Sequence, residues 1–189
     1  LDLENDVLVI GQPVPFDNLN ISGQVYIYRR FGTNWVLEQT LFESNPLTNE
    51  LFGAWVAISG QTVVAANSQD SSVVLGAGAV TVYTQIGTNW FFQAKLQASD
   101  PITNAHFGST VDIDGNTILV GAISAGNLTG SAYIFVRNGT NWAQQQKLQP
   151  ADLQIGAQFG GAVALQENVA AVGAQGQVIN GVVGGAVYV

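Results

Sequence analysis

Few residues of this chain have the chemical types that catalysis needs. The chain has one histidine, His106, and no cysteine, so disulfide and thiol chemistry are excluded. His106 could act as a general base, but no serine or cysteine nucleophile motif accompanies it in the sequence. We therefore interpret His106 as a loop residue, and we predict no catalytic residues and no enzyme activity.

The acidic residues do not predict a catalytic pair. Glycoside hydrolysis requires two carboxyl groups that flank one bond. Here the acids are scattered over predicted strand edges and turns, and we interpret them as a solvated surface: Glu38, Glu43, Glu50, Asp100, Asp152 and Glu167. The glycine-rich stretches open no predicted helix, so they predict neither a phosphate-binding loop nor any other cofactor site.

Three tryptophans recur in one phrase, Gly-Thr-Asn-Trp, which ends at Trp35, Trp90 and Trp142. An aromatic ring that recurs in this way could stack against a sugar in each copy. It could equally pack the corner of a structural unit against its neighbour. We favour packing and keep the three rings as candidate ligand contacts.

Composition excludes several classes of partner. The 189 residues carry a formal charge of −8 with only five Lys and Arg, which argues against nucleic acid and against anionic membrane surfaces. No apolar run approaches the roughly 20 residues that span a bilayer, so we expect no membrane insertion. The chain lacks Met and begins at Leu1 without a signal-like segment, which indicates a processed, trimmed or excised piece.

The chain repeats itself. The three repeated tryptophans are separated by 55 and 52 residues, and a second marker, Phe-Gly at Phe52, Phe107 and Phe159, has the same two separations. Two unrelated motifs with the same variable spacing indicate a true repeat of roughly 54 residues. We predict a single domain built of units 1–51, 52–106, 107–158 and 159–189, of which the last is incomplete.

Each unit contains four short segments rich in Val, Ile and aromatic residues, separated by Gly, Asn, Asp and Pro. These patterns predict β-strands, and no stretch keeps a helical period over three turns. Short turns join the first and second strands, longer loops join the second and third, and the Gly-Thr-Asn corner joins the third and fourth. A repeated four-stranded antiparallel meander is typical of a β-propeller blade, so we predict an all-β propeller segment.

Trp55 differs from the three repeated tryptophans. It stands where the other units have the small residues Thr110 and Ala162, on the predicted innermost strand. It could line the central channel or a junction between blades. We therefore favour Trp55 as a ligand contact over Trp35, Trp90 and Trp142.

Three features together resemble FG-GAP repeats, which build the integrin alpha-chain type of β-propeller. These are the Phe-Gly opening, the Val-Gly-Ala that ends the second strand at Val120 and Val172, and the segment GAVYV at 185–189. The resemblance covers essentially the whole chain, and the phrases GTNW and QAKLQASDP are similar to those of bacterial members. It implies a secreted or cell-surface scaffold for binding or adhesion, and some members are lectins.

The calcium loop of the cation-binding members, D-x-D-x-D-G between the first two strands, is absent. The nearest approach is the segment 112–116, where we predict a hairpin turn too short to wrap an ion that takes six to eight oxygens. We therefore predict no metal ligands. The sequence leaves calcium open in the other loops, where Asp17 and Asp70 lie, although it places no second carboxylate near either of them.

The predicted units amount to about three and a half blades, which leads us to expect a partial ring. We expect the chain to close a ring with another copy of itself, or to be part of a larger propeller. The favoured function is a non-catalytic extracellular scaffold that binds a protein or glycan through its longer loops on the two rims of the ring. The alternatives are a lectin with sites at blade junctions and an accessory domain of a secreted hydrolase.

Overall fold

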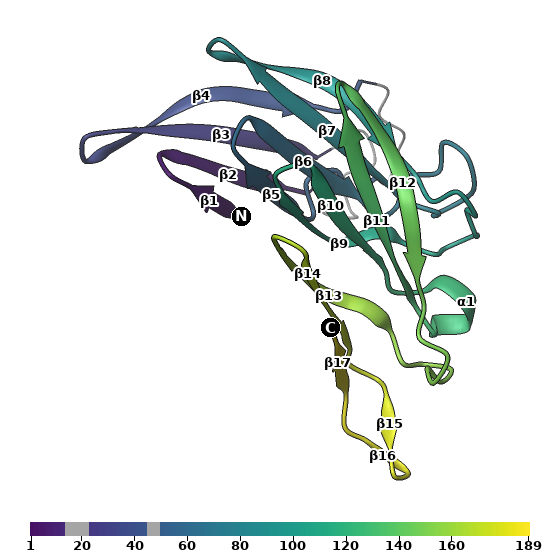
Figure 1. The fold of residues 1–189 in the computed structure, drawn as a ribbon. Coiled ribbons are helices and arrows are strands. Elements are labelled where there is room, and N and C mark those ends of the chain that lie inside the picture. The colour runs from purple at the N-terminus through teal and green to yellow at the C-terminus, as the bar shows by residue number, and fades with distance from the viewer. Residues whose placement is uncertain (14–22, 45–49) are drawn as a thin grey trace.

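The protein is an all-β structure in which antiparallel sheets follow one another along the chain (Figure 1). The computed structural model describes residues 1–13, 23–44 and 50–189. The first sheet contains β1 (Asp2–Glu4), β2 (Val7–Gln12), β3 (Gln24–Phe31) and β4 (Asn34–Phe42). The second contains β5 (Val56–Ser59), β6 (Thr62–Asn67), β7 (Ala79–Ile86) and β8 (Asn89–Leu96).

The third sheet contains β9 (Phe107–Asp114), β10 (Thr117–Ala122), β11 (Ser131–Asn138) and β12 (Asn141–Leu148). The fourth has three strands, β13 (Phe159–Gln166), β14 (Val169–Ala174) and β17 (Ala186–Tyr188), with a separate hairpin of β15 (Val178–Ile179) and β16 (Val182–Val183). Each of the first three sheets is a meander in which neighbours in sequence pair side by side. The predicted all-β blades are thus confirmed, while the boundaries of the repeat units stay a prediction.

The corner between the third and fourth strands depends on glycine. Gly32, Gly87 and Gly139 have φ angles of 61°, 65° and 63°. Residues with a Cβ atom adopt this left-handed backbone conformation only at a cost in free energy. The corner is a two-residue turn, since Phe31 pairs with Asn34 and Ile86 with Asn89. The tryptophan that follows each turn is the second residue of the outermost strand.

One short helical element interrupts the strands. The turn α1 (Ala125–Leu128) lies in the loop between β10 and β11. It is not a regular helix, because Gly126 and Asn127 have left-handed φ and ψ angles. No helix among the described residues is long and apolar enough to cross a membrane.

The core lies between successive sheets. The first and second sheets enclose one apolar cluster, the second and third a larger one, and the third and fourth a smaller one. Phe52, Phe107 and Phe159 are fully buried, one at each of these junctions. Phe107 meets Tyr133 and Phe135 edge-to-face, with ring centroids 5.4 and 5.8 Å apart. The stack of sheets curves into an arc that does not close into a ring (Figure 1).

Truncating the central phenylalanine tests this account of the core. We expect Phe107→Ala to lower the free energy of unfolding by about 3–5 kcal/mol, because it removes a fully buried ring. Phe31→Ala, at an exposed position on a corner, serves as the control and should change it by less than about 0.5 kcal/mol. Urea unfolding monitored by tryptophan fluorescence measures both, and equal effects would contradict the assignment of the core.

Candidate functional site

The longer connections of the fold gather on one rim, which we call the loop rim. It comprises the described loops 68–78, 97–106, 123–130 and 149–158. Backbone hydrogen bonds join them: Asn104 N donates to Leu75 O at 2.8 Å, and Ser124 N donates to Ala105 O at 3.2 Å. The prediction that these loops occupy two rims is wrong, because in a four-stranded meander the second and fourth strands end at the same edge of the sheet.

The loop rim contains a pocket of about 410 Å³ between the segment before β9 and the turn α1. Its wall is part apolar and part polar, with the following residues: Ile102, Thr103, Asn104, His106, Ser124, Gly126, Asn127 and Leu128. The pocket therefore offers hydrogen-bonding groups beside exposed apolar side chains, a combination found in binding sites.

The backbone around this rim pocket is strained. Asn104, His106, Asn127 and Leu128 have φ angles of 55°, 55°, 59° and 65°. They are half of the eight non-glycine residues with positive φ in the part of the chain that the structure describes. A bulky residue such as leucine adopts this conformation at a cost of about 1–3 kcal/mol. Strain of this kind is characteristic of segments that clamp ligands.

His106 has a serine partner in this pocket. The His106 Nδ1 lies 2.9 Å from the Ser124 Oγ. The sequence shows no sign of this contact, since Ser124 is 18 residues away, belongs to no nucleophile motif and reaches His106 only through the fold. Burial lowers the pKa of His106, so the imidazole is neutral at pH 7.

Among the residues that the structure describes, no third group joins the His106–Ser124 pair to activate a nucleophile. A serine hydrolase needs a group that orients the histidine through its other ring nitrogen. Among the described residues, no carboxylate contributes to the pKa shift of His106, which comes from burial alone. The pair thus has the geometry of a hydrogen bond that fixes the pocket wall.

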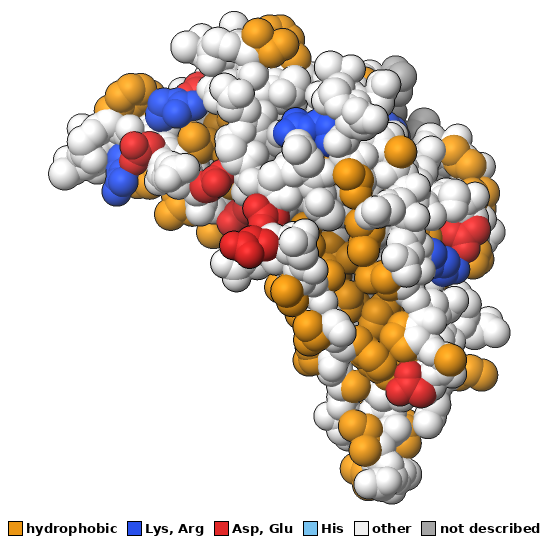
Figure 2. Space-filling model, viewed as in Figure 1, with side chains coloured by type: hydrophobic (Ala, Val, Ile, Leu, Met, Phe, Trp, Pro, Cys, Tyr) orange, Lys and Arg blue, Asp and Glu red, His pale blue; other side chains and the backbone are white. Residues whose placement is uncertain are grey.

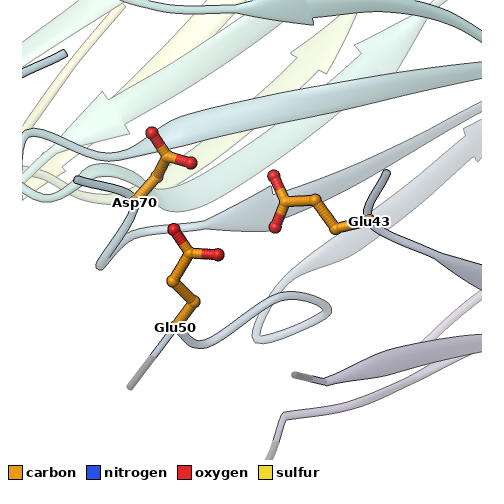
Figure 3. Close-up of side chains that lie close together, drawn as sticks. All are labelled: Glu43, Glu50 and Asp70. Atoms are coloured by element: carbon orange, nitrogen blue, oxygen red, sulfur yellow. The ribbon is translucent and has the colours of Figure 1, made fainter. Parts of the chain in front are cut away.

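A second polar site lies between the first and second sheets. Glu43, Glu50 and Asp70 are all buried, and one carboxylate oxygen from each lies within 4.8 Å of the others (Figure 3). The sequence-based view of Glu43 and Glu50 as solvated residues is wrong. The statement that no carboxylate lies near Asp70 is also wrong, because the three come together only through the packing of two sheets.

This carboxylate cluster stands where the next junction is apolar. When the repeats are aligned, Glu43, Glu50 and Asn67 correspond to Ala98, Ala105 and Ala122. Ala105 and Ala122 belong to the apolar core between the second and third sheets, and Ala98 packs against it. The polar residues at the first junction thus replace a set of alanines, so the repeat itself does not require them.

Lysine neutralises much of this cluster. The Lys95 Nζ lies 2.9 Å from the Glu43 Oε1 and also pairs with Asp70. Asn67 donates from its amide to Glu43 Oε2 at 2.8 Å. Carboxylate oxygens could hold a hard divalent cation, but the ammonium group already occupies the space between two of them. The arrangement is that of a buried ion-pair cluster, and the predicted absence of a metal ligand stays a prediction.

The charges shift the ionisation of their neighbours. Burial alone would raise the pKa of Asp70, but hydrogen bonds from Lys95 and Ser72 outweigh it and hold that pKa below its ordinary value. Burial would lower the pKa of Lys95, yet the bonds to Asp70 and Glu43 raise it. Both groups are therefore charged at neutral pH.

A third group of acids surrounds the hollow inside the arc, an opening of about 890 Å³ (Figure 2). The Asp112 Oδ2 accepts a hydrogen bond from the Leu165 N at 2.6 Å, and the Asp2 Oδ2 accepts one from the Ile58 N at 2.8 Å. Burial raises the pKa of Asp112, and the nearby Asp2 adds to this against the backbone bonds. These carboxylates hold successive innermost strands together.

The segment 112–116 is a hairpin turn, as predicted, because Asp114 pairs directly with Thr117 across it. Its two aspartates point to the next sheet: Asp112 contacts Leu165 N, and Asp114 accepts from Glu167 N. Asp17, the other loop aspartate considered as a calcium ligand, lies outside the described residues.

The repeated tryptophans brace one sheet against the sheet before it. The Trp90 Nε1 donates to Glu38 Oε1 at 3.0 Å, and the Trp142 Nε1 donates to Gln93 Oε1 at 2.9 Å. Glu38 and Gln93 occupy the same position of the repeat. Trp90 is buried, so its ring packs within the junction between the first and second sheets.

The tryptophans at the N-terminal side are accessible. Trp35 is partly exposed. The Arg30 guanidinium carbon lies over its ring, 5.7 Å from the ring centroid. Trp55 lies immediately before β5 and is half exposed. A ligand-contact role for Trp35, Trp55, Trp90 and Trp142 stays a prediction, and the fold does not bring the four rings into one site.

Repeated four-stranded blades stacked in an open arc define the protein as a partial β-propeller. The family model for the FG-GAP repeat matches residues 90–135 and 142–189. The chain belongs to the FG-GAP repeat family, whose propellers are generally non-catalytic. A comparison with curated proteins finds no match to this chain.

Removing the cation tests the buried carboxylate cluster. We expect Lys95→Met to lower the free energy of unfolding by about 3–5 kcal/mol, because it leaves buried carboxylates without their cation. Lys147 occupies the same repeat position but pairs with the partly exposed Asp100 at 2.7 Å, so Lys147→Met should cost about 1 kcal/mol or less. Chemical denaturation of both variants makes the comparison, and similar losses would contradict it.

The same cluster predicts a pH dependence. Because the pKa of Asp70 is lower in the folded chain, its ion pair contributes stability above the ordinary aspartate pKa of 3.8. This contribution is lost as the pH falls through the lower, folded-state pKa. Asp70→Asn should therefore be less stable than the wild type at pH 7 and should lose less on acidification. Thermal unfolding from pH 7 to pH 2 tests this, and parallel curves would argue against it.

Proposed function

We propose that the protein is a non-catalytic binding and adhesion scaffold that acts outside the cell, and that the loop rim binds the ligand. The observation that carries the proposal is the set of exposed apolar side chains on this rim: Val73, Leu75, Ile102, Leu128 and Ile155. Contiguous exposed apolar surface on a soluble protein is characteristic of a binding site.

The loop rim is also firm enough to bind selectively. Its segments are joined by backbone hydrogen bonds, including Gln158 N to Leu128 O at 2.9 Å and His106 N to Gly76 O at 3.2 Å. A ligand that meets a pre-ordered surface does not bear the full entropy cost of ordering it. Loops on a rigid β-scaffold are a common way to build such surfaces.

The chemistry of the loop rim favours a protein ligand over a glycan. Aliphatic side chains such as Leu75 and Ile102 gain free energy by contact with apolar surface, whereas sugar rings are bound by aromatic faces and polar groups. The accessible aromatic residues Trp35 and Trp55 keep a lectin as the second candidate. In that case the sugar would contact these rings instead of the aliphatic residues of the rim.

Two matched variants test the proposal. Leu75, in the loop that precedes β7 on the loop rim, and Ile86, at the end of β7 on the opposite rim, are 67% and 65% exposed. The purified chain would be applied to arrays of extracellular proteins and of glycans. We expect binding to one or more proteins, at least about tenfold weaker for Leu75→Glu and unchanged for Ile86→Glu.

Other outcomes of this experiment separate the candidates. Glycan binding that Trp55→Ala abolishes and Leu75→Glu leaves intact would overturn the protein-binding proposal and favour a lectin. Protein binding that Ile86→Glu abolishes and Leu75→Glu leaves intact would remove the loop rim from recognition. Circular dichroism of each variant confirms that the substitution has left the fold unchanged.

A further inference from the structure

At each inner junction, a Phe-Gly segment fits against glycine backbone of the preceding sheet. A Cβ atom added at Gly11 would lie 1.8 Å from the Gly53 O, and one added at Gly23 would lie 1.9 Å from the Phe52 O. Such distances are far below contact, so the backbone at Gly11 and Gly23 leaves no room for a Cβ atom. The backbone of Phe52 and Gly53 therefore occupies a socket that two glycines leave open.

A similar socket recurs at the next two junctions, although Ala66 stands in the second sheet at the repeat position of Gly11 and Gly121. A Cβ at Gly78 would lie 2.0 Å from the Phe107 O. A Cβ at Gly121 would lie 2.1 Å from the Gly160 O, and one at Gly130 would lie 2.1 Å from the Phe159 O. Isolated parallel bridges pair Gly78 with Phe107 and Gly130 with Phe159. Each following Phe-Gly is thus held through its main chain.

The fourth sheet carries the same glycines without an occupant among the described residues. Gly173 and Gly185 stand at the repeat positions of Gly121 and Gly130. The nearest atom to a Cβ at Gly173 is the Ala162 Cβ at 3.3 Å, and at Gly185 it is the Gln175 O at 3.5 Å. Both glycines line a groove of about 440 Å³. We call this groove the terminal socket.

Conformation alone does not explain the glycine at 173. Gly185 has a φ of 67° and needs glycine for that reason, but Gly173 has no positive φ. A glycine inside a strand weakens it and marks a site where another backbone approaches closely. At Gly121 the approaching backbone is that of Gly160, and at Gly173 the corresponding position is open.

Side chains around the terminal socket match those of the occupied sockets. Val187 on β17 is 70% exposed, whereas its counterparts Val25, Val80 and Ala132 are each 0% exposed. These three are buried by the sheet that follows. Hydrophobic side chains run along the fourth sheet, in the lower part of the space-filling view (Figure 2). The fourth sheet thus presents the face that the other sheets present to a neighbour.

We propose that the terminal socket at Gly173 and Gly185 binds a further Phe-Gly strand. The occupant presents a phenylalanine ring, then a glycine, then an extended strand that pairs along the face of β14 and β17. Its glycine takes a left-handed φ, as at Gly53, Gly108 and Gly160, where φ is 83°, 87° and 90°. The proposal rests on the repeated junction and is independent of the proposed function.

A peptide from the chain itself supplies the probe. Residues 157–168, AQFGGAVALQEN, contain the Phe-Gly and the inner strand that fill the socket of the third sheet, which has glycine at both positions like the terminal socket. We expect the fluorescently labelled peptide to bind the full chain saturably, and the Phe159→Ala peptide to bind at least about tenfold more weakly. Fluorescence anisotropy measures both affinities.

Gly173→Ala places a methyl group in the terminal socket. Only Ala162 lies near it in the free chain, so we expect the melting temperature to stay close to that of the wild type and peptide affinity to fall by at least about tenfold. Gly121→Ala is the matched control, because its methyl group would collide with Gly160 and should lower the melting temperature. Val187→Glu, at an exposed position beside the groove, gives a second variant that tests peptide binding if Gly173→Ala proves unstable.

Three results would overturn the proposal. The first is a wild-type chain that does not bind the peptide. The second is binding that neither Gly173→Ala nor Val187→Glu weakens. The third is a wild-type chain that does not bind the peptide but forms a dimer in light scattering, while both variants are monomeric. That result would make this face a contact between copies of the chain.

Discussion

The main-chain contact between Phe-Gly and the preceding sheet is the constraint on which the rest of this structure depends. Sheets that stack face to face usually stay about 10 Å apart because side chains fill the space. At Gly11 and Gly121 the following backbone approaches to contact with the strand itself. Glycine in a strand costs roughly 0.5–1 kcal/mol relative to alanine, and here the cost is offset by burial of a phenylalanine ring. Every repeat can therefore dock only in one register on the one before it.

Once that register is set, polar groups can be placed across each junction with precision. Asp2 and Asp112 accept from the backbone of the next innermost strand, while Trp90 and Trp142 donate to the outer strand of the sheet before. The inner and outer edges of a junction are thus both fixed by hydrogen bonds, with the apolar core between them. This double fixation lets the chain keep its geometry with few charged residues.

The repeat, the strands and their order could be predicted from the sequence because each leaves a local signal. Gly87 and Trp90 mark a corner, and Phe107-Gly108 marks the start of a sheet. The carboxylate cluster leaves no such signal, because Glu43 and Asp70 belong to different sheets and each alone resembles a surface acid. Comparison of aligned units could have found it, since Glu43 and Asn67 replace the small apolar residues Ala98 and Ala122. The pairing of His106 with Ser124 also depends on how two loops meet and has no counterpart in sequence spacing.

The two rims of the molecule differ in how much their residues can change without disturbing the fold. The opposite rim carries the two-residue turns of Gly32, Gly87 and Gly139, whose glycines fix the backbone, so it leaves little room for new chemistry. The loop rim carries loops whose backbones are held by hydrogen bonds, such as Asn104 N to Leu75 O. Some of their side chains are buried, such as Ala105, but others, such as Leu75, are exposed. A residue such as Leu75 can change there without disturbing Phe107 or Gly121. Binding specificity can therefore evolve at such exposed positions of the loop rim while the buried Phe-Gly contacts recur from one repeat to the next.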